Sequence, residues 1–252
     1  MQCPKVAVFD LDETLAFTLQ APSPEITAGL VTLLARMPLC IMTGRRFQEV
    51  QREFLAPFAA SPDAERFYLM TSGGSKGFRY EHGVWSELFS HDLSQTQRDE
   101  IRRAIEETIS ETNVLEGIPC YGERYVDKGT MLTFAMLGYP VPADAKRSWD
   151  PGNARRKKFW ETLSPKLPAY DVYMGGLSAI DVTLKGVNKA SGVRWLSEHL
   201  NVAPQDMLYV GDALFEGGND AVVIPTGIQT RPVSGPPETA KVLDQLLAAC
   251  GS

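Results

Sequence analysis

Residues 6–14, VAVFDLDET, decide the fold class of this chain. The first four form a short apolar run rich in β-branched side chains, which is typical of a strand buried on both faces of a parallel sheet. Asp10 and Asp12 follow at the point where that strand should end. In open α/β sheets the ligand crevice lies outside the carboxyl ends of the strands. We therefore expect both carboxylates to belong to a functional site.

An alternation of strands and helices continues outward from this run. Apolar residues recur at helical spacing from Ile26 to Met37, and a second helical pattern covers residues 45–55. Further apolar runs typical of buried strands lie at residues 39–42, 67–70, 207–210 and 222–224. More helices are expected over residues 189–200 and in the last stretch, up to residue 249. This rhythm predicts an α/β fold whose core is a Rossmann-like, doubly wound parallel sheet.

The middle of the chain has a different pattern. Ser94 and Gln97 form a capping-box pair that should open a helix. The elements expected after it are a strand, a charged helix and a hairpin, at residues 131–138, 154–163 and 170–184. Grouped helices and strands of this kind predict an α+β domain with an antiparallel sheet. The expected division is a core of residues 1–81 and 187–252 interrupted by an inserted domain of residues 82–186.

Composition excludes some classes of function. The 252 residues include 25 Lys and Arg against 31 Asp and Glu, a net charge of −6, and 44% are apolar. This is an ordinary globular composition, long enough for one large or two modest domains. An acidic chain is a poor candidate for binding nucleic acid, because neutralising phosphates requires a basic surface. We interpret the basic run at residues 155–158 as a solvated helix face.

The cysteines and apolar runs bear on the compartment. The four cysteines are scattered without metal-binding or redox spacing, at positions 3, 40, 120 and 250. We interpret them as reduced thiols, although the sequence leaves two disulfides open. No apolar run reaches the length of a secretory signal or a membrane span. The expectation is a cytoplasmic protein with no membrane partner.

The spacing of Asp10 and Asp12 indicates a particular chemistry. Residues two apart in a strand point to the same face, and two carboxylates held together repel unless a cation lies between them. Asp10 would serve as nucleophile and metal ligand, and Asp12 as general acid and base. The structural alternative is a strand-end turn that caps the next helix.

The stretch Phe9–Leu15 resembles the first motif of the haloacid dehalogenase superfamily, whose members mostly transfer phosphoryl groups through an aspartyl-phosphate. Two further motifs follow in that family's order. In Ile41–Gly44, the resemblance implies that the Thr43 hydroxyl, Gly44 and the next helix N-terminus hold the phosphate. Lys189 would neutralise the aspartate and phosphoryl charges. We prefer it to Lys185 because it follows a Gly-x-x sequence and opens a helix.

The fourth motif, residues 209–220 (YVGDALFEGGND), is the most specific. Here the resemblance implies that Asp212 shares a divalent metal with Asp10, while Asn219 and Asp220 hold waters or orient Lys189. Carboxylate and carbonyl oxygens suit octahedral Mg²⁺. The predicted metal site consists of Asp10, Asp12, Asp212, Asn219 and Asp220.

The inserted domain resembles the large α+β cap class of this superfamily, and within it the phosphomannomutase-like subgroup. The resemblance lies in residues 129–138, in residues 175–182 and in the fourth-motif loop. It implies that Lys128, Lys146 and Asp181 contact the substrate. The mutases clamp a sugar phosphate with several arginines, whereas this chain has Lys128, Tyr139 and Lys146 at the corresponding positions.

These departures decide the expected reaction. A mutase needs two phosphate-binding subsites of comparable strength. Because this chain lacks the arginines that form the distal subsite, we expect hydrolysis of the aspartyl-phosphate instead. We predict a Mg²⁺-dependent phosphatase acting on a small phosphorylated metabolite, with a sugar phosphate as the expected substrate. The alternatives are a sugar phosphomutase and, in a different class, a catalytically degenerate phosphate sensor or scaffold. A homodimer formed through the cap would agree with the resemblance. Glu13 stands where the family usually has glycine, which could alter the turn.

Overall fold

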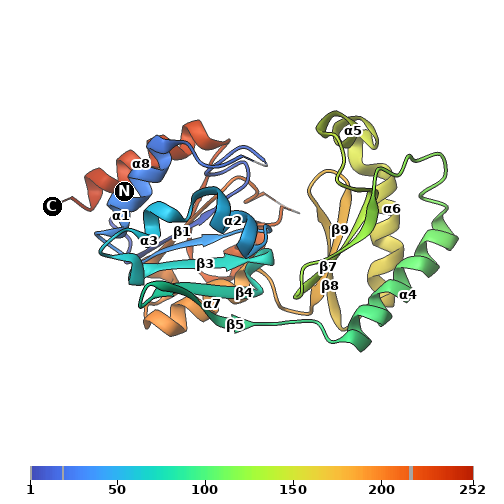
Figure 1. The fold of residues 1–252 in the computed structure, drawn as a ribbon, viewed down its shortest axis with the longest axis horizontal. Helices are drawn as coiled ribbons and strands as arrows, with labels where there is room; N and C mark the ends of the chain where they lie inside the picture. Colours follow the sequence, from blue (N-terminus) through green and yellow to red (C-terminus); the bar gives the residue numbers. More distant parts are fainter. Residues whose placement is uncertain (1, 19, 216–217, 252) are drawn as a thin grey trace. The chain divides into compact units, whose positions relative to one another are not determined.

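The computed structural model describes residues 2–18, 20–215 and 218–251. The chain forms two compact units (Figure 1). The first contains residues 1–90 and 188–252, and the second contains residues 91–187. Within the described residues, no helix has the length and apolar character needed to cross a membrane.

The first unit is built on a seven-stranded sheet with the order β11-β10-β1-β2-β3-β4-β5. The strands from β11 to β3 in that order are parallel, and β4 and β5 are antiparallel additions at one edge. Their bounds are β1 Val6–Asp10, β2 Leu39–Met42, β3 Phe67–Thr71, β4 Lys76–Glu81, β5 Val84–Ser90, β10 Met207–Gly211 and β11 Gln229–Pro232. The predicted parallel α/β core is confirmed.

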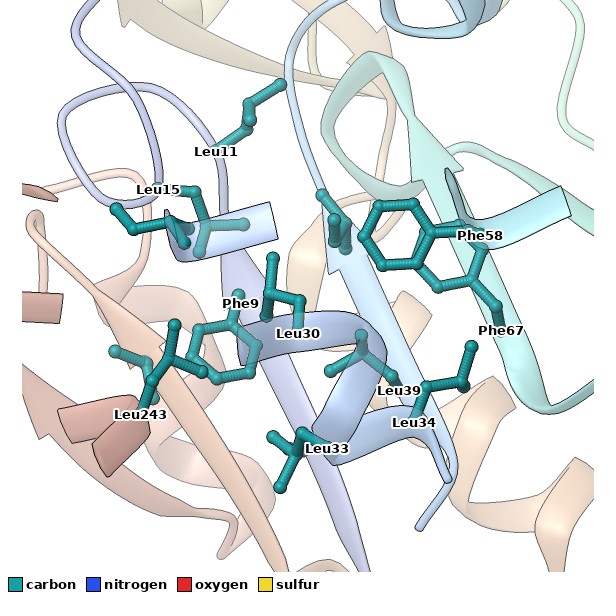
Figure 2. Close-up of a cluster of buried hydrophobic side chains, with 14 of the residues drawn as sticks. Phe9, Leu11, Leu15, Leu30, Leu33, Leu34, Leu39, Phe58, Phe67 and Leu243 are labelled. Atoms are coloured by element: carbon teal, nitrogen blue, oxygen red, sulfur yellow. The ribbon is translucent and has the colours of Figure 1, made fainter. Parts of the chain in front are cut away.

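Helices cover both faces of this sheet. Alternate side chains of each strand point to opposite faces, and because these strands are apolar throughout, both faces must be shielded from water. From β1, Ala7 and Phe9 join the apolar cluster that includes side chains of α1 and α8, whereas Val6 and Val8 join the cluster beneath α7. Figure 2 shows Phe9 beside leucines of α1 and Leu243 of α8. The helices are α1 Pro24–Leu34, α2 Phe47–Phe54, α3 Ala56–Ala59, α7 Lys189–Leu200 and α8 Pro236–Ala249.

Four short 3₁₀ segments complete the first unit, and one of them corrects a prediction. They are η1 Ala64–Arg66, η2 Ser72–Gly74, η5 Pro204–Asp206 and η6 Ala221–Thr226. The strand expected at residues 222–224 is wrong, because these residues lie in η6 and the edge strand is β11. Pro225 has no N–H to donate to a strand ladder, and Gly227 then turns the chain with a φ of 83°.

The hairpin of β4 and β5 was not expected from the sequence. Its turn lies at His82 and Gly83, which have φ values of 52° and 84°. Because β5 pairs along β4, residues up to Ser90 remain with the first sheet. The first unit therefore extends past residue 81, where the sequence suggested that the core would be interrupted.

The second unit packs helices on one face of an antiparallel sheet with the order β6-β7-β9-β8. Leu132, Phe134, Ile180 and Val182 form its core with side chains of α4 and α6. The Ser94–Gln97 capping box is present at the start of α4, as predicted. The bounds are α4 Gln95–Thr112, β6 Glu123–Asp127, β7 Met131–Tyr139, α5 Ala143–Ser148, η3 Pro151–Asn153, α6 Ala154–Leu163, η4 Ser164–Lys166, β8 Tyr170–Gly175 and β9 Ala179–Leu184.

Two interpretations of local sequence are wrong. Cys3 and Cys250 form a disulfide that joins the start of the chain to the end of α8, so the four cysteines are not all reduced thiols. Cys40 and Cys120 remain free. In the basic run of α6, Arg156 is only 3% exposed, so that run is not a uniformly solvated face. The other three basic residues of the run are exposed.

Candidate active site

The topology brings three sequence motifs to one edge of the first sheet. Strands β10, β1 and β2 are neighbours and run parallel, so their carboxyl ends lie side by side. Asp10 ends β1, Thr43 follows β2, and Asp212 follows β10. Lys189 is the first residue of α7 and lies among them. Asp10 and Asp212, which are separated by 202 positions, thus meet at the carboxyl ends of adjacent strands.

A buried carboxylate cluster forms the centre of the site. Oxygens of Asp10, Asp212 and Asp220 lie within 4.8 Å of one another. The Lys189 Nζ donates to Asp10 Oδ1 at 2.5 Å and to Asp220 Oδ1 at 2.6 Å. Asp10, Asp220 and Lys189 are all buried, and Asp212 is partly exposed. We call these four residues the carboxylate–lysine cluster.

The cluster holds more negative charge than its lysine can neutralise. Burial raises the pKa of Asp10 to about 7, against the pull of Lys189, and the charges of Asp220 and Asp212 raise it further. Burial and the charge of Asp220 also raise the pKa of Asp212. Burial lowers the pKa of Lys189, but Asp10 and Asp220 together more than reverse this effect. Three carboxylates and one ammonium group suit a divalent cation that prefers oxygen ligands, such as Mg²⁺.

Asp220 is held by neighbours that the sequence reasoning missed. The Tyr209 hydroxyl donates to Asp220 Oδ1 at 2.6 Å, and the Ala213 N–H donates to Oδ2 at 3.1 Å. Gly211 permits this approach, because a Cβ there would lie 2.3 Å from Asp220 Oδ2. Nothing in the apolar β10 sequence distinguishes Tyr209 from an ordinary core residue. Only the fold shows that its hydroxyl reaches the site.

Thr14 ties the first and fourth motifs together. Its Oγ1 donates to Asp212 Oδ1 at 3.2 Å and accepts from the Asp212 N–H at 3.0 Å. Its carbonyl accepts a hydrogen bond from the buried Thr239 hydroxyl of α8. Thr14 is part of the D-x-D-x-T pattern, so its presence in that motif was the available signal for a site role.

Of the five predicted metal ligands, Asp12 and Asn219 are not among the residues that define the carboxylate–lysine cluster. Asp12 is not among the carboxylates that gather within 4.8 Å, and its side chain instead contacts Arg45. Asn219 is exposed. Residues 216 and 217 of the same motif lie outside the described part of the chain. The structure therefore assembles Asp10, Asp212 and Asp220, and it directs Asp12 to a different cation.

The second motif lies on a tight loop after β2. Thr43 is fully buried, and its Oγ1 accepts a hydrogen bond from the Arg45 N–H at 3.1 Å. The Thr43 carbonyl accepts from the Gly73 N–H at 2.9 Å, which connects this loop to the end of β3. Gly44 is exposed. The loop leads directly into α2, whose N-terminus carries the partial positive charge expected to favour an anion.

Comparison with known proteins agrees with this geometry. The sequence profile of the haloacid dehalogenase-like hydrolases matches residues 151–220. This match covers the fourth motif and Lys189 and makes that part of the chain similar to the haloacid dehalogenase-like hydrolases. A probable phosphomannomutase of Caenorhabditis elegans is 22% identical over 250 residues, which cover 96% of this chain and 95% of the relative.

Solved structures show the same fold. The IMP-bound, N-terminally truncated IMP-nucleotidase of Plasmodium falciparum superposes with a TM-score of 0.74 at 17% identity, covering 98% of this chain and 68% of that one. The C-terminal domain of the trehalose-6-phosphate phosphatase of C. albicans gives 0.66 at 16% identity, covering 98% and 93%. The predicted fold is confirmed, and the predicted resemblance to haloacid dehalogenase-like hydrolases agrees with the profile match.

Glu13 replaces the glycine that haloacid dehalogenases usually carry in the first motif. The structure shows why glycine suits this position and how the Glu13 side chain is held there. The backbone at this position has a φ of 58°, in the left-handed region that favours glycine. The Glu13 carboxylate accepts from the Thr18 N–H at 2.9 Å and from the Thr18 hydroxyl at 2.7 Å. These two hydrogen bonds offset the conformational cost and close the loop on itself.

The three predicted substrate residues of the second unit lie on separate elements. Lys128 is in the turn before β7, Lys146 is in α5 beyond the other end of β7, and Asp181 is in β9. β7 has nine residues, so its ends lie roughly 30 Å apart at strand spacing. Asp181 accepts a hydrogen bond from the Thr133 hydroxyl. Burial lowers the pKa of Lys146. Within this unit the three side chains do not share one element or one end of the sheet.

Proposed function

We propose that this protein is a Mg²⁺-dependent phosphatase that hydrolyses a small phosphorylated metabolite, such as a sugar phosphate, through an aspartyl-phosphate. The observation that carries the proposal is the position of Asp10. Its carboxylate ends the central strand, lies 2.5 Å from the Lys189 ammonium and belongs to a cluster with two more carboxylates. A nucleophilic carboxylate needs cationic neighbours that let an anionic phosphoryl group approach it. Lys189 is one such cation, and a Mg²⁺ ion bound by the three carboxylates would be the other.

The first chemical step would transfer the phosphoryl group to the protein. Asp10 forms a bond from one carboxylate oxygen to phosphorus while the bond to the leaving oxygen breaks. Asp12 gives its proton to that oxygen, so the alcohol leaves neutral. Thr43, the α2 N-terminus and Lys189 would stabilise charge on the other phosphoryl oxygens.

The second step would return Asp10 to its starting state. Asp12, now a carboxylate, takes a proton from water, and the resulting hydroxide attacks phosphorus. The bond between phosphorus and Asp10 breaks, and inorganic phosphate leaves. A Mg²⁺ ion held by Asp10, Asp212 and Asp220 would supply charge neutralisation at the phosphoryl group. Lys128, Lys146 and Asp181 would select the leaving group, a role that we infer from the family resemblance.

A phosphomutase is the second candidate, and one observation favours it. The Caenorhabditis elegans relative is described as a probable phosphomannomutase and aligns over nearly the full length of both chains. A mutase must also bind the distal phosphate of a bisphosphate intermediate. At the arginine positions of that subgroup this chain has Lys128, Tyr139 and Lys146, which lack the planar fork of arginine. We therefore favour hydrolysis.

One paired assay separates the two candidates. Purified protein with Mg²⁺ is screened against sugar phosphates, nucleoside monophosphates and other phosphorylated metabolites for release of inorganic phosphate. In parallel, conversion of mannose 1-phosphate and glucose 1-phosphate to the 6-phosphates is followed with a bisphosphate activator present. Phosphate release that EDTA abolishes and Mg²⁺ restores would support the phosphatase. Efficient isomerisation with little release would support the mutase, and neither activity would overturn both.

A further inference from the structure

Arg45 lies in an ionic network beside the carboxylate–lysine cluster. Its Nε donates to Asp12 Oδ1 at 3.0 Å and to Oδ2 at 3.1 Å, and its Nη2 donates to Oδ1 at 2.5 Å. The guanidinium group thus donates hydrogen bonds to both oxygens of the Asp12 carboxylate. Arg45 itself is only 8% exposed. The planar fork of arginine matches a carboxylate in a single orientation, so this contact fixes the direction of Asp12 as well as its charge.

The other side of Arg45 is also held. Its Nη1 pairs with Glu53 of α2, and its Nη2 donates to the Gln20 carbonyl at 3.1 Å. Its backbone N–H donates to the Thr43 hydroxyl. The guanidinium position is therefore determined by the loop after β1, the loop after β2 and α2 together. A side chain held from three directions can act as a rigid support for a fourth group.

The two cations of the site serve different carboxylates. Lys189 contacts Asp10 and Asp220, whereas Arg45 contacts Asp12 and Glu53. If Arg45 were present only to neutralise charge near the nucleophile, it would contact the carboxylates of the cluster. It contacts Asp12 instead, which is not part of the cluster.

We infer that Arg45 is a positioning residue that orients Asp12 for proton transfer to the leaving oxygen, and that Glu53 in turn positions Arg45. This inference rests on the proposed phosphatase reaction. Arg45 does not enter the bond-making steps. Asp12 must begin the first step protonated on one oxygen while the other accepts from Arg45, and that proton moves to the leaving oxygen as the bond from that oxygen to phosphorus breaks. Arg45 determines how often Asp12 points in the productive direction.

The test compares two substrates whose leaving groups differ in how much they need a proton from a general acid. An alkyl phosphate must expel an alkoxide and needs general-acid help, whereas p-nitrophenyl phosphate expels a stable phenolate and needs little. The measured quantity is kcat/KM, because it reports the steps up to transfer of the phosphoryl group to Asp10. For Arg45→Met, kcat/KM should fall about 10²-fold with an alkyl phosphate and less than about fivefold with p-nitrophenyl phosphate.

Four further variants test whether the loss of kcat/KM is selective for the alkyl phosphate. Asp12→Ala should show the same selective loss, to a greater extent. Arg45→Lys should recover part of the alkyl activity, because the charge returns without the fork. Glu53→Gln should give a smaller selective loss than Arg45→Met. Arg52→Met, at an exposed arginine of the same helix, serves as the matched control and should leave both substrates unaffected.

The outcomes separate this inference from the proposed function. If the wild-type protein hydrolyses neither substrate with Mg²⁺, the phosphatase proposal fails. If it hydrolyses both and Arg45→Met reduces both equally, Arg45 binds phosphate or supports folding, and the inference is overturned. Thermal unfolding of each variant identifies a folding defect. For a destabilised Arg45→Met, the double variant Arg45→Met/Glu53→Met also removes the partly buried Glu53 charge that has lost its partner. It must show the same selective loss for the inference to survive.

Discussion

The two units of the protein use buried charge in different ways. In the first unit, buried Lys189 and Arg45 contact the carboxylates of Asp10, Asp220 and Asp12 at the open end of the sheet. In the second unit, buried Arg156 donates to the carbonyls of Gly175, the last residue of β8, and Gly176, the first residue of the turn to β9. The buried cations of the first unit thus contact carboxylates at the candidate active site, whereas buried Arg156 contacts backbone carbonyls of its own unit.

Under the proposed function, this difference would assign the reaction to the first unit and substrate selectivity to the second. The site residues of the first unit are supplied by the ends of adjacent parallel strands, which meet in any doubly wound sheet. The predicted substrate residues of the second unit lie on a turn, a short helix and a mid-strand position. Changes in the first unit should therefore abolish turnover, and changes in the second should alter substrate preference or folding. The four predictions below test this division.

The largest effect is expected at Asp10. Asp10→Asn keeps the shape of the side chain but removes the nucleophile, so kcat should fall by about 10⁴-fold or more. The matched change in the second unit, Asp181→Asn, should leave kcat within about tenfold and act mainly through KM, because uniform substrate binding is lost. Steady-state kinetics on the best substrate from the metabolite screen measures both. A loss of kcat at Asp181 as large as that at Asp10 would remove the division between the units.

The next effect concerns Lys189. Lys189→Met leaves Asp10 and Asp220 without their ammonium partner, so kcat should fall by about 10²–10³-fold. Breaking this buried pair should also cost about 3–5 kcal/mol of unfolding free energy in the absence of metal. Lys185→Met is the control, because Lys185 is exposed and donates to the Pro168 carbonyl in the second unit. Equal effects at the two lysines would show that the wrong lysine has been placed in the site.

The third prediction uses the raised pKa of Asp10. In the folded, metal-free protein burial raises this pKa to about 7, above the value of about 4 expected in the unfolded chain. The folded state therefore binds this proton more tightly, and the unfolding free energy falls as pH rises from about 4 to about 7. Asp10→Asn should abolish this pH-dependent fall of the unfolding free energy, because asparagine has no carboxyl proton to lose. In EDTA, the variant should be more stable than the wild type at pH 8 by a few kcal/mol, about 2–4, and the gap should narrow at pH 5.

Urea unfolding of both proteins at the two pH values measures this effect. Mg²⁺ at pH 8 should stabilise the wild type more than Asp10→Asn, since the cation neutralises a charge that only the wild type carries. A stability difference independent of pH, together with equal Mg²⁺ responses, would show that the carboxylate–lysine cluster is not charged as the structure indicates.

The smallest effect is expected in α6. Arg156→Met removes the donors to Gly175 and Gly176 and should cost about 1–3 kcal/mol of unfolding free energy. Lys158→Met, at an exposed position of the same basic run, should stay within about 0.5 kcal/mol. Neither variant should reduce kcat by more than about threefold, since an exposed substitution or a local loss of stability leaves the reacting groups in place. A large rise of KM in Arg156→Met would assign this arginine to substrate binding.

Much of the first unit could be predicted from local sequence. The apolar runs of β1, β2, β3 and β10 identify parallel strands, because strands buried on both faces must be apolar throughout. Once these strands are adjacent, Asp10, Thr43 and Asp212 must share an edge. The η6 segment was mistaken for a strand, since a short apolar run does not distinguish a strand from a helical segment. The β4–β5 hairpin was missed because its strands are only half-buried.

The site contacts of Asp12 and Asp220 could not be predicted in this way. The partners Arg45 and Tyr209 lie next to obvious motif residues, yet nothing in their local sequence shows where their side chains point. The same holds for Cys3 and Cys250, which are separated by 247 residues and meet only because the first strand and the last helix belong to one unit.

The sequence alone therefore determined the kind of chemistry and the strands that carry it, because residue type and strand order are local properties. Tertiary structure decided which cation contacts which carboxylate: Lys189 contacts Asp10, and Arg45 contacts Asp12. That choice depends on side-chain directions from three or four distant segments, and each direction depends on packing across the whole first unit. Burial then determined the electrostatics, since the pKa of Asp10 rises only when the fold removes it from water.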